Sequence, residues 1–187
     1  LVRNLKTLTK ALFYLLPSEN EFVIYRSIKA LIRLLHVASI EPSLVTPMID
    51  LLYNLFNMSE YIKILVLEAI SSMVFSAEIN VRKYAVDIFN TAKNALLSSD
   101  PCLNATAIES LANLLYYCHD ALDSKAVEVF DILLAFCKDE NPDVRGSVAF
   151  GFRVFLKNGK KWEKVFFPHR QEIMDFVDRT LEMFIGE

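Results

Sequence analysis

Four residues suited to begin a helix recur at one interval along this sequence. Ser18, Ser59, Asp100 and Asn141 are spaced 41 positions apart, and Ser18 also has capping-box spacing to Glu21. Side chains of Ser, Asp and Asn accept hydrogen bonds from the N–H groups that the first turn of a helix leaves unpaired. A proline follows each of the last two, at the first helical position, where a missing N–H costs nothing. The interval therefore predicts a repeated helical unit.

The hydrophobic pattern predicts helices along the whole chain. Apolar residues recur three and four positions apart and do not alternate, and only 4 glycines are available for tight turns or a phosphate-binding loop. The predicted helices cover residues 1–16, 19–36, 43–57, 60–76, 79–97, 101–118, 123–138 and 142–157, with a last helical stretch within 160–186. Helices of about four turns joined by short loops favour antiparallel neighbours, paired as an A helix and a B helix.

The B helices, which follow the caps, share four aligned positions. The first position holds a small residue: Ala30, Ala69, Ser110 and Gly151. The other three hold large apolar residues: Leu31, Ile70, Leu111 and Phe152; Leu34, Met73, Leu114 and Phe155; Leu35, Val74, Leu115 and Leu156. The aligned positions of the last three helices are 41 residues apart, whereas those of the first and second helices are 39 apart. We interpret this difference as a small insertion near residues 20–22. Stacked pairs of this kind build a continuous core.

One stretch of the sequence resembles a known repeat. Residues 139–148 (Asp-Glu-Asn-Pro-Asp-Val-Arg-Gly-Ser-Val) resemble the second-helix signature of HEAT repeats, in which an Asp/Asn-Pro turn leads into Val-Arg and small apolar residues. Residues 99–107 are a weaker copy, with Asn104 where Arg is usual. Armadillo repeats are similar in length but use three helices, and this chain has two per unit. The resemblance implies an all-α fold, a right-handed α-α superhelix of about four HEAT-like helical pairs plus a C-terminal helix.

The resemblance also implies an organisation and a role. The repeats would cover about 1–36, 43–76, 79–118 and 123–157, with a helical cap over 160–186, in one solenoid segment spanning 1–187. A helical pattern already runs at Leu1, so we expect a piece of a longer protein. Members of this superfamily are typically scaffolds, such as phosphatase scaffold subunits, nuclear transport receptors and vesicle-coat adaptors. They imply a non-catalytic adaptor that binds other protein subunits, without a cofactor, in the cytoplasm or nucleus.

Composition and motifs point away from several other classes. No apolar run approaches the roughly 18–20 residues that a membrane span needs. Cys102, Cys118 and Cys137 show no metal-ligand spacing, so we expect reduced thiols serving as small core residues. His119 with Asp120 has no further ligand pair, and Cys118 beside His119 is poorly placed for proton transfer on a helix. With no phosphate loop or nucleophile elbow either, the sequence does not predict an enzyme.

One row of residues is a candidate partner-binding surface. Arg26, Lys29 and Arg33 have i, i+3, i+7 spacing, which places them on one face of the first B helix. The position before the small column varies freely between repeats, as a partner-facing row would. We predict that the contact row consists of Arg26, Lys29, Arg33, Glu68, Glu109, Phe150, Arg153 and Lys157. Phe150 is either an exposed anchor or a residue packed against the C-terminal helix.

A second basic segment supports an alternative. Residues 153–170 carry six Lys and Arg against one Glu, interleaved with Trp162, Phe166 and Phe167. Basic and aromatic residues together bind nucleic acid, and the candidates here are Lys160, Lys161, Lys164 and Arg170. The i, i+4, i+5 spacing of the aromatics also fits a core-facing helix, and both basic clusters fit ordinary solvated faces. The net charge of −3, and fifteen acidic against seven basic residues in 37–152, count against nucleic acid.

Overall fold

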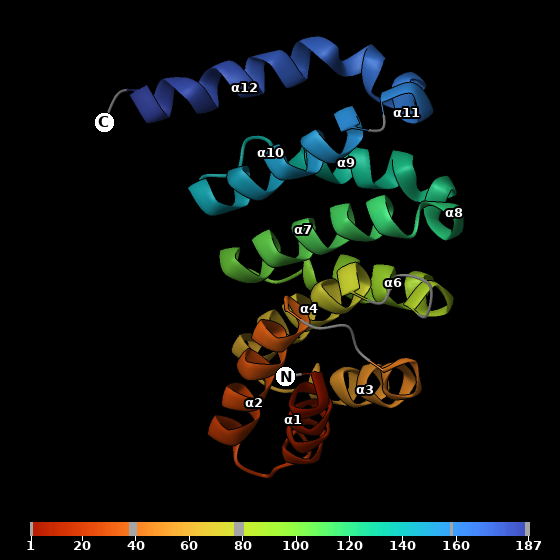
Figure 1. Cartoon of the computed structure of the whole chain (residues 1–187). Coiled ribbons are helices and arrows are strands. Elements are labelled where there is room, and N and C mark those ends of the chain that lie inside the picture. Colours follow the sequence, from red (N-terminus) through yellow and green to blue (C-terminus); the bar gives the residue numbers. More distant parts are fainter. Residues whose placement is uncertain (1, 38–40, 77–80, 158, 186–187) are drawn as a thin grey trace. The chain divides into compact units, whose positions relative to one another are not determined.

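The computed structural model describes residues 2–37, 41–76, 81–157 and 159–185, which form helices and turns without a strand. Figure 1 shows the chain from the N-terminus in red to the C-terminus in blue. Its helices gather into two compact units, Leu1–Asn90 and Thr91–Glu187. Each unit is described by itself below. The all-α fold predicted from the hydrophobic pattern is confirmed for the described residues.

The first unit consists of two helical pairs followed by part of a third. α1 (Val2–Leu15) and α2 (Glu21–Leu35) form the first pair, and α3 (Pro42–Leu55) and α4 (Glu60–Ser76) form the second. α2 packs on α1 and on α4, and α4 also packs on α3. The 3-10 turn η1 (Arg82–Tyr84) then leads into α6 (Ala85–Ala95), which crosses the boundary between the units.

The second unit is built around α7 (Pro101–Tyr117) and α10 (Pro142–Lys157), which pack extensively on one another and run in the same direction (Figure 1). Between them lie α8 (His119–Leu122), the 3-10 turn η2 (Asp123–Lys125) and α9 (Ala126–Phe136). The predicted stretch within 160–186 is divided into α11 (Gly159–Phe166), the 3-10 turn η3 (Phe167–His169) and α12 (Arg170–Ile185). Pro168 lies in η3, where its ring and missing N–H prevent a continuous helix.

The cap of α2 is not the predicted Ser18. Asn20 caps this helix, because its side-chain oxygen accepts a hydrogen bond of 2.9 Å from the backbone N–H of Phe22. The capping box is not formed either, since Glu21 accepts a hydrogen bond from the Ser59 hydroxyl. With Asn20 as the cap, the small-column residue lies ten positions after the cap in all four B helices. The first interval is therefore 39 because the segment between α2 and α4 is shorter, and the predicted insertion near 20–22 was wrong.

The turns before α7 and α10 are built alike. The cap residue of each accepts hydrogen bonds from the helix's first turn: Asp100 from Cys102 at 2.8 Å and Asn141 from Asp143 at 2.8 Å. The backbone N–H of the same cap residue donates to a side chain two positions earlier. Each turn is thereby closed on both sides of the cap.

A longer side chain from each helix also reaches back to its turn. Arg145 Nη1 donates to the backbone carbonyls of Asp139 and Glu140, each at 2.8 Å. Asn104, at the aligned position of α7, donates to the carbonyl of Ser98 at 3.2 Å. The asparagine therefore makes the same kind of bond as the arginine that the repeat signature favours.

The aligned positions of the B helices form the core of both units. All large-column residues except one are buried, as are three of the four small-column residues; the fourth, Ala30, is half-buried. The exception is Leu156, whose side chain is 59% exposed, so its predicted place in the core was wrong. Leu156 lies on α10, lines a groove between α10 and α12, and is not covered by α12.

Close packing explains why the small column holds a glycine, Gly151, in α10. A Cβ added at Gly151 would lie 2.5 Å from Cδ2 of Leu133 in α9, too close for any real contact. Gly146, five residues earlier on α10, has nothing within 4 Å of such a Cβ. Of the two glycines in this helix, only Gly151 is therefore needed for close packing of the A and B helices.

Aromatic rings fill the core of the second unit. Phe130 in α9 lies edge-on to Phe152 and Phe155 of α10, with ring centroids 5.7 and 5.3 Å apart. Phe152 in turn meets Phe176 of α12 at 5.6 Å, and Phe155 meets Trp162 of α11 at 5.1 Å. These contacts attach the last two helices to the α9–α10 pair.

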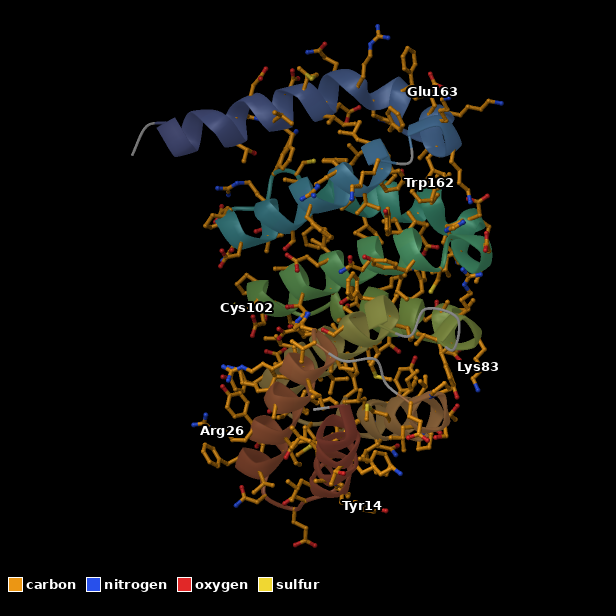
Figure 2. The ribbon with its side chains drawn as sticks, in the orientation of Figure 1. Tyr14, Arg26, Lys83, Cys102, Trp162 and Glu163 are labelled. Carbon is orange, nitrogen blue, oxygen red and sulfur yellow. The ribbon has the colours of Figure 1, made fainter. Side chains whose placement is uncertain are left out.

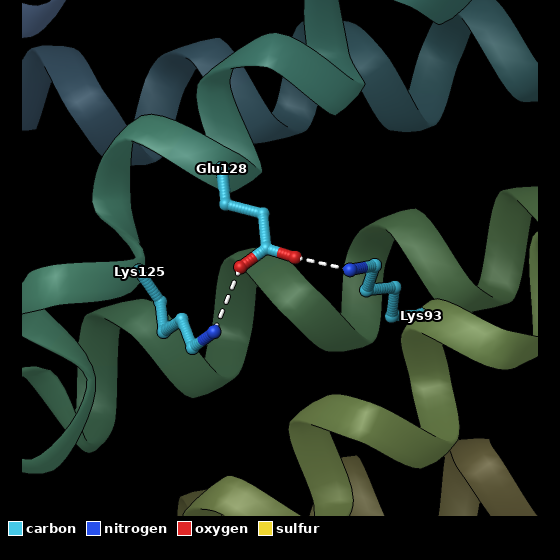
Figure 3. Close-up of polar contacts among 3 residues, drawn as sticks. All are labelled: Lys93, Lys125 and Glu128. Atoms are coloured by element: carbon cyan, nitrogen blue, oxygen red, sulfur yellow. Dashed lines mark hydrogen bonds and ion pairs between the residues drawn. The ribbon is translucent and has the colours of Figure 1, made fainter.

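A pair of ion contacts joins α6 to α9 on the surface of the second unit. Figure 3 shows the Glu128 carboxylate between Lys93 of α6 and Lys125, which lies 2.9 Å away. Hydrogen bonds from Lys93 first, and then from Lys125, lower the pKa of Glu128. Because all three side chains are partly exposed, the contribution to stability is modest.

Candidate functional site

The three predicted cations of α2 lie around one groove on the first unit. This groove has a volume of about 420 Å³ and is lined by Leu8, Arg26, Lys29, Ala30, Arg33, Leu34 and Val37. Leu8 comes from α1 and is 48% exposed, and Val37, just beyond α2, is 72% exposed. Arg26 and Arg33 are exposed, and Figure 2 shows Arg26 on the outer side of the unit. The groove thus combines an uncovered apolar wall with three positive charges.

An aromatic cluster adjoins these cations, and the sequence analysis did not identify it. The rings of Tyr25 in α2 and Tyr61 in α4 stack with centroids 5.1 Å apart. The guanidinium of Arg26 lies 5.0 Å from the ring centroid of Phe22 and 5.7 Å from that of Tyr25. Phe22 and Tyr61 are 62% and 56% exposed. One signal could have revealed them, since Phe22 and Tyr61 each lie two residues after a helix cap.

A hydrogen-bond network links the cluster to Lys29. The Lys29 ammonium donates to the Tyr25 hydroxyl at 2.8 Å, and the Tyr61 hydroxyl donates to the same oxygen at 3.1 Å. The bond from Lys29, and then that from Tyr61, lowers the pKa of Tyr25, while donating to Tyr25 raises the pKa of Tyr61. The pKa of Lys29 is raised by its bond to Tyr25. Lys29 therefore stays charged at neutral pH and its ammonium is held beside the groove.

The remaining predicted row residues fall into different settings. Glu68 is exposed on α4 in the first unit. In the second unit, Glu109 on α7 is exposed and accepts a hydrogen bond of 2.9 Å from the Ser147 hydroxyl of α10. Phe150 is half-buried, and it is Phe152, two residues on, whose ring meets the C-terminal helix. Phe150 is therefore not a fully exposed anchor.

Arg153 and Lys157 lie together at a second groove. This groove lies between α10 and α12 and is lined by Ala149, Phe152, Arg153, Leu156, Lys157, Ile173, Phe176 and Val177. Both cations are exposed, and the Lys157 ammonium lies 5.4 Å from the ring centroid of Tyr116 in α7. Each unit thus has an apolar groove with cations on a B helix. Within the first unit Arg26, Lys29 and Arg33 share one groove, and within the second unit Arg153 and Lys157 share another.

The residues of the basic segment at α11 lie in different environments. Trp162 is buried, and its indole N–H donates to Asp123 at 3.0 Å. Lys161 pairs with the same carboxylate at 3.1 Å, and these two contacts, the bond from Trp162 first, lower the pKa of Asp123. Lys160 and Lys164 are exposed. Of the four predicted nucleic-acid contacts, Lys161 is therefore partly used in an intramolecular ion pair.

The predicted core position of the three aromatics in this segment holds for Trp162 alone. Phe166 is half-buried, while Phe167 is 51% exposed and lies 4.8 Å from the Arg170 guanidinium, measured to the ring centroid. The backbone of Trp162 departs from helical geometry at φ −113° and ψ 17°, and η3 begins at Phe167. The i, i+4, i+5 spacing assumes one continuous helix from Trp162 to Phe167, and the helix is irregular at both of these residues.

The cysteines occupy two kinds of environment. Cys118 and Cys137 are buried, and burial raises the pKa of the Cys137 thiol to about 11, so it stays protonated at neutral pH. Cys102 is exposed near the start of α7, which corrects the expectation that all three would be core residues. Among the described residues, no three His, Cys, Asp or Glu side chains converge as metal ligands would. The described helices also include none whose length and hydrophobicity would let it cross a membrane.

Comparisons with known proteins bear on the fold alone. No protein-family model and no curated protein matches the sequence. A crystal structure of an engineered protein, Northeast Structural Genomics Consortium target OR329, is similar in fold, with a TM-score of 0.60 and 16% sequence identity. The match covers 93% of this chain and 78% of that one. At this level of identity the likeness shows a shared arrangement of helices.

Proposed function

We propose that this chain is a non-catalytic protein–protein interaction scaffold, an adaptor subunit of a larger intracellular complex in the cytoplasm or nucleus. The observation that carries the proposal is the groove in which Arg26, Lys29 and Arg33 surround an exposed apolar wall. Exposed apolar surface with charge of one sign suits a protein partner of opposite charge. The aligned, buried positions of the B helices support a HEAT-like frame, a right-handed superhelix that displays its B helices on a concave face.

A double charge reversal tests this proposal. We expect tagged wild-type chain to capture protein partners from cell lysate, and Lys29→Glu with Arg33→Glu to lose them, because the reversed charges repel an acidic surface. Arg33 is exposed and Lys29 half-buried at the surface, so the variant is expected to keep the wild-type helical content and unfolding midpoint. Unchanged capture by a folded variant would contradict the proposal.

A matched control variant is available in the second unit. Lys160→Glu with Lys164→Glu makes the same change in net charge at two exposed residues of α11. We expect this variant to capture the same partners as the wild type. Equal loss in both variants would mean that overall charge, and not the groove, determines binding.

The alternative function is that of a nucleic-acid or chromatin-associated HEAT-like module that uses the basic segment 153–170. The observation that favours it is the exposed ring of Phe167 beside Arg170, a pair on which a base could stack. This alternative predicts that captured partners vanish after nuclease treatment. It also predicts that Lys160→Glu with Lys164→Glu removes them, and that affinity for oligonucleotides falls steeply with salt.

A further inference from the structure

Two positions of the B helices stay open to solvent in every helical pair. The residues two positions after the cap are all exposed: Phe22, Tyr61, Cys102 and Asp143. None of the residues nine positions after the cap is buried: Lys29, Glu68, Glu109 and Phe150. Both positions are open in α4, which packs on α2 and α3, and in α7, which packs on α9 and α10. Stacking of helices therefore leaves the surface that carries Phe22, Lys29 and Tyr61 uncovered.

On this surface the ammonium of Lys29 is held by neutral groups. It donates to the Tyr25 hydroxyl at 2.8 Å and lies 5.0 Å from the centroid of the same ring. The bond to Tyr25 is the main cause of the raised pKa of Lys29, and no carboxylate among the described residues contributes to the shift. By contrast, the ammonium of Lys161 lies 3.1 Å from a carboxylate. The charge of Lys29 is therefore fixed in position without being neutralised by a described residue.

Arg26 adds a second charge of the same kind. Its guanidinium lies 5.0 Å from the ring centroid of Phe22 and 5.7 Å from that of Tyr25, and it forms no ion pair with a described carboxylate. The Tyr25 oxygen accepts hydrogen bonds from Lys29 and from Tyr61. Because both of its lone pairs are used in this way, the Tyr25 O–H is left to donate to a ligand. Two charges and a hydroxyl donor thus meet on the face shared by α2 and α4.

This set of donors suits a phosphate monoester better than a carboxylate. A phosphorylated side chain has three strong acceptor oxygens and a charge of about −2, whereas a carboxylate has two oxygens and a single charge. Guanidinium and ammonium groups are the usual protein partners of phosphate. The rings of Phe22 and Tyr61, which are 62% and 56% exposed, add apolar surface beside the charges. A phosphorylated peptide with an apolar neighbouring residue combines both kinds of contact.

We propose that this face of α2 and α4 binds a phosphorylated segment of a partner protein. The phosphate accepts hydrogen bonds from Lys29, Arg26 and the Tyr25 hydroxyl. An apolar residue next to the phosphorylated one packs on the exposed rings of Phe22 and Tyr61. This inference rests on the proposed function, because it names the class of partner that the scaffold binds.

Beads coated with peptide pools test the need for phosphate on the whole chain. One pool has a central phosphoserine and randomised flanking residues, and two matched pools have serine or glutamate at the centre. We expect the phosphoserine beads to bind the wild type about tenfold more tightly than either matched pool, because the phosphate accepts from more donors. Equal binding to serine beads, or equal binding to glutamate beads, would overturn the inference.

Two conservative variants identify the contact. Tyr25→Phe removes the hydroxyl, and Lys29→Gln removes the charge, so each is expected to weaken binding to phosphoserine beads about tenfold. The matched controls Tyr14→Phe and Lys10→Gln make the same changes at exposed positions of α1 and are expected to bind as the wild type does. Circular dichroism and thermal unfolding check that all four variants are folded. Unchanged binding by folded Tyr25→Phe or Lys29→Gln would overturn the inference.

Soluble competitors separate a phosphorylated peptide from other sources of phosphate. We expect the free phosphoserine pool to release the chain from the beads at a concentration about tenfold lower than inorganic phosphate requires, because only the peptide also contacts Phe22 and Tyr61. Equal release by inorganic phosphate would show an anion site without peptide recognition and would overturn the inference. Stronger release by a single-stranded oligonucleotide would overturn it in favour of nucleic acid.

Phosphatase treatment of the cell lysate separates this inference from the proposed function. We expect protein partners captured from untreated lysate to be lost after treatment. Capture that survives phosphatase but is lost in Lys29→Glu with Arg33→Glu would overturn the phosphate site and leave the scaffold function in place. Specific binding to phosphoserine beads by a chain that captures no protein would support the phosphate site and contradict the scaffold function.

Discussion

One aromatic cluster of the first unit lies on the surface, whereas one aromatic cluster of the second unit lies in the core. In the first unit Phe22 and Tyr61 lie on the surface, 62% and 56% exposed, beside the cations of α2. In the second unit Phe130, Phe155 and Phe176 are buried and join three helices through ring contacts. The same residue type therefore stabilises the fold in one cluster and is available for contact in the other. Burial, and not residue type, decides which of the two roles an aromatic residue has.

The largest expected effect compares one ring from each unit. Phe130→Ala is expected to lower the free energy of unfolding by about 3–5 kcal/mol, because it removes a buried ring and leaves a cavity. Phe22→Ala is expected to change it by no more than about 0.5 kcal/mol, since the ring is exposed. Urea denaturation followed by circular dichroism measures both. A comparable loss in Phe22→Ala would show that the surface cluster is structural and would remove the contrast between the two clusters.

A smaller effect concerns the tight packing that the second unit needs. Gly151→Ala is expected to be destabilising by about 1–3 kcal/mol, because its Cβ would lie 2.5 Å from Leu133 Cδ2 and the core would be overpacked. The matched variant Gly146→Ala has open space and is expected to stabilise the fold by about 0.5–1 kcal/mol through helix propensity. Thermal unfolding of the two variants gives the sign of each change. Stabilisation by Gly151→Ala would mean that Leu133 moves away freely.

The smallest expected effect is on the pH dependence of the second unit. Because the folded-state pKa of Asp123 lies below its ordinary value, the contacts to Trp162 and Lys161 stabilise the fold at neutral pH and are lost as the pH falls through that lowered pKa. Trp162→Phe is expected to raise the Asp123 pKa toward its ordinary value, measured by NMR titration of the carboxyl carbon. Lys161→Gln is expected to raise it by less, because the bond from Trp162 is the larger cause. A larger rise of the Asp123 pKa in Lys161→Gln than in Trp162→Phe would show that the ion pair with Lys161 is the main cause of the lowered pKa.

Much of the fold could be predicted from the sequence because it depends on local rules. Helix periodicity and the prolines after Asp100 and Asn141 placed α7 and α10 to within one residue at each end. The first cap was wrong because Ser18 and Asn20 are both good capping residues two positions apart, and only the structure shows which side chain binds the helix. Spacing alone does not decide between two such neighbours.

The candidate site was only partly predictable. Spacing indicated that Arg26, Lys29 and Arg33 share a face of α2, and the structure places all three at one groove. The aromatic cluster was missed because Tyr25 and Tyr61 come from different helices, and their stacking depends on how α2 packs on α4. Leu156 was misplaced for a related reason, since its burial depends on how closely α12 covers α10. The hydrophobic pattern of one helix does not show which residues of a neighbouring helix it contacts.

The bonds that Arg145 and Asn104 make to their turns also bear on how the chain folds. Each bond joins residues no more than six positions apart, and the cap bonds join residues two or three apart. Such short loops close with little loss of chain entropy and on fast timescales. The starts of α7 and α10 can therefore form before the helices meet, and later docking has only to join preformed turns. In refolding we therefore expect these turns to form early, with docking of the helices as the slower step.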